Sequence, residues 1–162
     1  MDLDELRAVT AYAITCAEPA LARFESHRPG DGRPRQAIEA ARAFAEGGPR
    51  TKAIRDGAWA AQRAYREARD AGQRAASEAA RAAVAAASAA YLHPIPKATQ
   101  VWHILGAAAH AAHAAELDGG APPAAVAPGP TVIAVLNRYP PAPTGRGRTG
   151  ELLRELDRRP RG

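Results

Sequence analysis

The chain has 162 residues, enough for one domain with a modest core, and about a quarter of them are alanine while only 5% are aromatic. Alanine is the strongest helix former but buries little area, so stability must come from close helix approach around a few large side chains. The 22 basic and 17 acidic residues leave a mild net charge of +5, and the lone Cys16 excludes an intramolecular disulfide bond.

The first predicted helix covers residues 3–26, with Asp2 as its cap. Its apolar residues follow helical spacing, but Pro19 lies inside the pattern and predicts a kink or a break. A turn follows, and a second helix is expected over residues 34–46, because proline is favoured in the first turn and glycines follow its end.

The third predicted helix starts near Thr51 and ends or kinks at Gly72. Ile54, Trp59 and Tyr65 are its large apolar side chains. We expect Trp59 and Trp102 to be core anchors rather than platforms on which bases stack.

Alanine dominates the next two predicted helices, residues 73–92 and 97–117, which the Pro-rich residues 93–96 separate. Small residues occur on every face of residues 73–92, so neighbouring backbones can approach closely. Together these elements predict an all-α fold, an antiparallel bundle of about five helices over residues 1–120.

Residues 121–162 form a Pro-rich C-terminal extension in this interpretation. It begins with an extended Pro/Ala linker over residues 121–130. The apolar run over residues 131–136 fits a strand, a short helix or a docked segment, and its exposed apolar residues would favour a homodimer. A short final helix is expected over residues 151–159.

Six arginines give the C-terminal tail its basic charge: Arg146, Arg148, Arg154, Arg158, Arg159 and Arg161. We expect a solvated, disordered tail rather than a nucleic-acid-binding one. No targeting segment is recognised at the N-terminus, and no stretch is apolar enough for a membrane span, so we expect a soluble cytoplasmic protein.

Charged residues gather where the first two predicted helices meet: Glu18, Glu25, Asp31, Arg33, Arg35 and Glu39. A cation such as Arg35 in the first helical turn opposes the helix dipole, which predicts carboxylate partners for it. The cluster is either an internal ion-pair network that fixes the corner or a pocket for an anion or a partner's carboxylate.

Histidines supply the other candidate chemistry. His93 and His103 flank the proline break and could act as acid and base if they converge. His110 and His113 lie one turn apart, but no further ligand is identified and no zinc signature is present, so we expect no metal and no other cofactor.

Part of the chain resembles a family of small helical bacterial proteins, the immunity-protein-5-like family. The resemblance spans about residues 6–117 and rests on Cys16-Ala17-Glu18, Leu21, Phe24-Glu25, Pro29, Asp31, Arg33-Pro34-Arg35, Ala37–Ala41, His93, His103 and Leu105–Ala108. It implies an all-helical fold that binds and neutralises a toxin. His110 and His113 stand where the family pattern has tyrosine and lysine, and residues from 121 onward have no counterpart in it.

Two functions follow from these observations. The first is an immunity-type protein that neutralises a toxic partner in the cytoplasm through Glu18, Asp31, Arg33, Arg35 and Glu39. The alternative is a small helical enzyme or small-molecule-binding protein of a biosynthetic or self-resistance pathway. Its interhelical pocket would contain Trp102, His110 and the candidate catalytic pair His93 and His103.

Overall fold

The computed structural model describes residues 1–162 and contains helices but no strands, which confirms the predicted all-α bundle. No helix is both long and apolar enough to cross a lipid bilayer. The elements are α1 (Leu3–His27), α2 (Arg33–Ala45), α3 (Lys52–Asp70), α4 (Arg74–Ser88), the 3₁₀ turns η1 (Ala89–Tyr91) and η2 (Ala98–Gln100), α5 (Val101–Leu117), α6 (Pro130–Leu136) and α7 (Gly147–Arg161).

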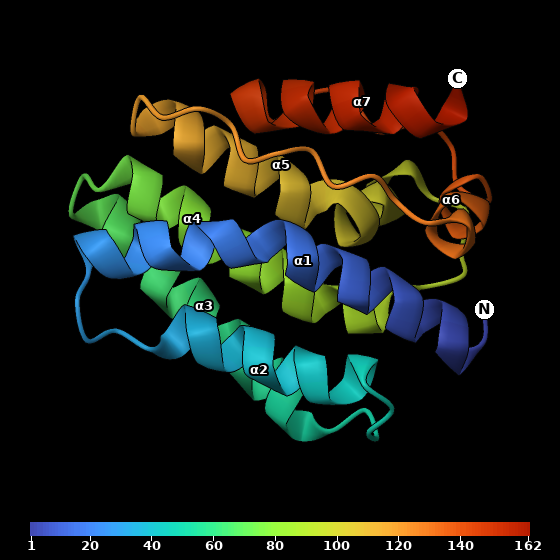
Figure 1. Cartoon of the computed structure of the whole chain (residues 1–162), viewed down its shortest axis with the longest axis horizontal. Coiled ribbons are helices and arrows are strands. Elements are labelled where there is room, and N and C mark those ends of the chain that lie inside the picture. The colour runs from blue at the N-terminus through green and yellow to red at the C-terminus, as the bar shows by residue number, and fades with distance from the viewer.

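Helices α1 and α4 occupy the middle of the bundle (Figure 1). Helices α2 and α3 cover one side, while α5 and then α7 cover the other. Helix α4 packs against α1, α2, α3 and α5, so it is the element around which the others assemble.

Helix α4 can hold this central position because its buried side chains are small. Eight of its alanines and one serine are buried: Ala75, Ala76, Ser77, Ala79, Ala80, Ala82, Ala83, Ala86 and Ala87. The large anchors come from its neighbours, and they are fully buried: Phe24, Phe44, Ile38, Ile54, Ile104 and Leu105. Large residues on the outer helices therefore pack against a thin central one.

Helix α1 begins at a capping box in which Asp2 and Glu5 satisfy each other's backbone N–H groups. It then continues through Pro19 to His27. Of the two outcomes expected at Pro19, a kink or a break, the break does not occur. Pro19 and Thr15 are both exposed. The Thr15 carbonyl that loses its helical donor can therefore bond to water, which lowers the cost of the proline.

The C-terminal extension is ordered. The apolar run over residues 131–136 forms α6, which buries Val132, Val135 and Leu136 within the chain itself, and this removes the reason for expecting a homodimer. Residues 121–129 have no helix or strand, and the Tyr12 hydroxyl donates a 3.3 Å hydrogen bond to the Val126 carbonyl.

The prediction of a disordered basic tail is wrong, since residues 147–161 form helix α7 along α5. Leu152 and Leu153 join the core. Arg148 pairs with Glu116 of α5 at 2.7 Å, and Arg161 pairs with the buried Asp157 at 2.7 Å. Glu116 of the bundle and the buried Asp157 of α7 itself thus neutralise part of the charge that suggested a solvated segment.

Enlarging a small residue of α4 should disrupt this packing. We expect Ala80→Leu to lower the free energy of unfolding by about 1–3 kcal/mol, because Ala80 is fully buried among neighbouring helices. Ala53→Leu, at an exposed position of α3, should change it by less than about 0.5 kcal/mol, since leucine and alanine have similar helix propensity. Urea unfolding followed by circular dichroism measures both, and equal effects would contradict the packing argument.

Candidate functional site

The charged residues at the first interhelical corner pair with one another. Arg33 donates to both oxygens of Asp31, at 2.9 and 2.8 Å, and also to Glu67 of α3, at 3.1 and 2.5 Å. The hydrogen bonds from Arg33 hold the pKa of Asp31 and that of Glu67 below their usual values. These contacts connect the loop before α2 to α3.

Helices α1 and α2 are joined by a second set of pairs. Arg35 donates to Glu25, with its Nε 3.1 Å from the carboxylate. Arg42 bridges Glu18 at 2.5 Å and Glu39 at 3.5 Å. The corner residues therefore form separate ion-paired groups rather than one cluster, and the guanidinium groups of Arg33 and Arg35 already have carboxylate partners.

His93 and His103 lie in different surroundings. The Nδ1 atom of the exposed His93 accepts a hydrogen bond from the Ile95 amide at 3.1 Å, and its carbonyl accepts one from the Tyr139 hydroxyl at 2.7 Å. His103 instead lines a surface groove that does not include His93. His93 thus stabilises the proline-rich turn and its contact with the C-terminal segment.

A buried polar cluster contains His110 and connects three helices. His110 is only 6% exposed, and its Nδ1 lies 2.7 Å from Glu78 of α4. The Thr149 hydroxyl of α7 donates to the same carboxylate at 3.3 Å and lies 2.8 Å from His113 Nδ1. These side chains link α4, α5 and α7.

Trp102 covers the outside of this cluster. Its ring lies 5.6 Å from that of His110, and the Arg146 guanidinium lies 4.7 Å from the Trp102 ring. Arg146 adopts the left-handed conformation, with φ of 60°, in the turn that starts α7. Trp102 therefore packs against the core and helps to place α7.

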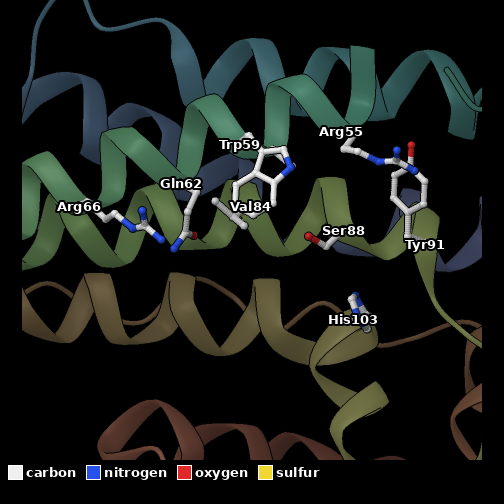
Figure 2. Close-up of a pocket in the computed structure, with 9 residues that line it drawn as sticks. Arg55, Trp59, Gln62, Arg66, Val84, Ser88, Tyr91 and His103 are labelled. Carbon is white, nitrogen blue, oxygen red and sulfur yellow. The ribbon is translucent and has the colours of Figure 1, made fainter. Parts of the chain in front are cut away.

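A surface groove of about 630 Å³ opens between α3, α4, η1 and α5. Figure 2 shows α3 along one side of it, with Val84 and Ser88 of α4 and Tyr91 of η1 facing that helix. Its lining residues are Arg55, Ala58, Trp59, Gln62, Arg66, Val84, Ser88, Tyr91 and His103.

The groove combines aromatic and cationic groups without any acid. Trp59 is 59% exposed, although it is one of the largest apolar side chains in the chain. The Arg55 guanidinium lies 5.4 Å from the centre of the Tyr91 ring, and neither Arg55 nor Arg66 has a salt bridge. Tryptophan, tyrosine and arginine are the residues that dominate the energetics of protein interfaces.

The expectation that Trp59 is a core anchor is therefore wrong. The buried residues of α3 are Ile54, Ala61, Ala64 and Ala68, and at 3.6 residues per turn Trp59 lies on the opposite side of the helix from them. The helical spacing thus indicates an exposed tryptophan, although large apolar side chains are usually assigned to the core.

His103 contributes an uncharged polar group to the groove. Burial lowers its pKa, and a hydrogen bond with the Ser88 backbone only partly opposes this effect. Because no carboxylate lines the groove, His103 has no acid nearby to orient or charge it. The arrangement is suited to binding through apolar contact and cationic side chains.

The family described as "Imm-5 like putative immunity protein" matches residues 2–127, most of the chain. No curated protein and no solved structure matches it.

His103 and His110 predict a loss of stability in mild acid. Burial lowers the pKa of His103 and of His110, so the unfolded chain binds protons more readily than the folded one. Their contribution to folding is complete above the unfolded histidine pKa of about 6.5 and declines as the pH falls below it. We expect the free energy of unfolding to decrease from pH 7 to pH 5.

His110→Gln tests the origin of this pH dependence. Glutamine can still donate to Glu78 but does not titrate, so the decrease between pH 7 and pH 5 should be smaller than in the unmodified chain. Urea unfolding at a series of pH values measures the slope, and an unchanged slope would show that His110 does not contribute.

Proposed function

Because this chain belongs to the family of Imm-5 like putative immunity proteins, we propose that it neutralises a toxic protein partner by binding it in the cytoplasm. The groove between α3, α4 and α5 is the surface we assign to this contact. A binding protein of this kind needs no turnover chemistry, since it acts by occluding the surface of its partner.

The observation that supports this proposal best is the exposure of Trp59 within the groove. An exposed tryptophan costs solubility unless something covers it, and buried tryptophans are the commonest anchors of protein interfaces. Arg55 and Arg66 flank Trp59 and supply polar contacts at the rim. The surface around Trp59 thus has the composition of an interface centre.

The alternative, a histidine-containing pocket for a small molecule, has weaker support. It needs His93, His103, His110 and Trp102 to converge. His103 is the one of these four that lines the groove, whereas His110 and Trp102 contribute to the cluster around Glu78. The groove also lacks the acid that would complete a catalytic pair.

Removing the Trp59 side chain tests the proposal. The probe is a candidate toxin, chosen as a protein that a gene neighbouring this one encodes, purified and also expressed with the full chain in a sensitive host. We expect the unmodified chain to restore growth and form a stable complex. Trp59→Ala should weaken binding by about tenfold or more, because an interface anchor is lost.

Leu3→Ala is the matched control, since Leu3 is also a large exposed apolar residue but lies outside the groove. It should bind the toxin within about twofold of the unmodified chain. Absence of both complex and protection with the unmodified chain would refute the proposed function. Equal losses in the two variants would refute the assignment of the groove.

A further inference from the structure

One face of α3 presents a continuous stripe to the groove. Arg55, Trp59, Gln62 and Arg66 are spaced i, i+4, i+7 and i+11, which places them on the same side of the helix. Eleven residues at 1.5 Å each separate the two arginines by about 16 Å along the helix axis. Figure 2 shows Trp59 and Gln62 between them.

The neighbouring acids of α3 do not neutralise this stripe. Asp56 pairs with Lys52 at 3.1 Å, while Glu67 points to Arg33 at the corner, at 2.5 Å. Arg55 and Arg66 have no acidic partner within the chain. Their charges therefore remain available to carboxylates that approach from outside.

The apolar middle of the groove favours a side chain of a protein over a nucleic-acid base. Proteins that bind single strands use successive aromatic platforms along a basic track. Here both the Arg50 and the Arg55 guanidinium groups lie over the Tyr91 ring, at 5.2 and 5.4 Å, so that ring is already engaged. Trp59, with Val84 and Ala58 beside it, offers one apolar contact site.

We propose that the groove receives an acidic segment of the partner, in which two carboxylates about 16 Å apart pair with Arg55 and Arg66 and an apolar side chain between them packs on Trp59. This inference rests on the proposed function and specifies the chemistry of the toxin surface. In an extended segment, two acids about five residues apart are separated by this distance. In a helix, the two acids must be about eleven residues apart.

Peptide selection tests this chemistry without knowledge of the toxin. A library of displayed random peptides of about twelve residues covers both spacings. The full chain is the bait, and Arg55→Glu/Arg66→Glu is used for counterselection. We expect the enriched peptides to carry acids on both sides of an apolar residue. Enrichment of basic or neutral peptides, or of none, would overturn the inference.

Charge reversal then measures the role of the two arginines. For a selected acidic peptide, the Arg55→Glu/Arg66→Glu variant should bind about 30-fold more weakly or worse, because two attractive contacts become repulsive. Arg158→Glu/Arg159→Glu is the matched control, since it makes the same change in net charge at two exposed arginines of α7. The affinity of this control variant for the peptide should lie within about threefold of that of the unmodified chain. Equal weakening in both variants would overturn the inference.

Two further measurements separate the alternatives. The first measures binding of a single-stranded oligonucleotide. If the unmodified chain binds it and the Arg55→Glu/Arg66→Glu variant does not, the groove belongs to nucleic acid and the inference is overturned. In the toxin protection assay, full protection by this variant would refute the inference while leaving the proposed function intact. Failure of the unmodified chain to protect would refute the proposed function itself. Thermal unfolding verifies that each variant is folded.

Discussion

Close packing around an alanine-rich central helix is the constraint on which the rest of this structure depends. Because the buried side chains of α4 are almost all methyl groups, four other helices can contact it, and the large anchors project inward from those neighbours. A core of this kind has little spare volume, so each helix is fixed in position by its neighbours. The same geometry packs both α3 and α5 against α4 and so creates the groove that carries Trp59.

Polar contacts join the helices both at the exposed corner and in a buried cluster. The corner network around Arg33 joins α2 to α3, and the cluster around Glu78 joins α4, α5 and α7. Exposed ion pairs contribute little individually, but several that share carboxylates specify how helices meet. The two networks lie away from the groove, so structure and binding use different sets of charges.

Much of this fold could be predicted from local patterns, because glycines, prolines and helical periodicity mark the ends of α1 to α5. The folded conformation of the C-terminal segment could not be predicted in this way. It depends on contacts between residues distant in sequence, such as that of Arg148 with Glu116. The groove was missed for a different reason. A large apolar residue is assigned to the core by default, and only its angular position on α3 indicates that Trp59 faces outward.

Contacts made by Tyr91 brace one end of the groove. Two guanidinium groups lie over the ring, while its hydroxyl donates to the Thr51 carbonyl at 3.3 Å. Side chains in such contacts have less rotational freedom to lose when a partner binds, so association incurs a smaller entropic penalty there. A ligand seated against Tyr91 would meet a preorganised surface, and differences in affinity among ligands would arise mainly from how slowly each one dissociates.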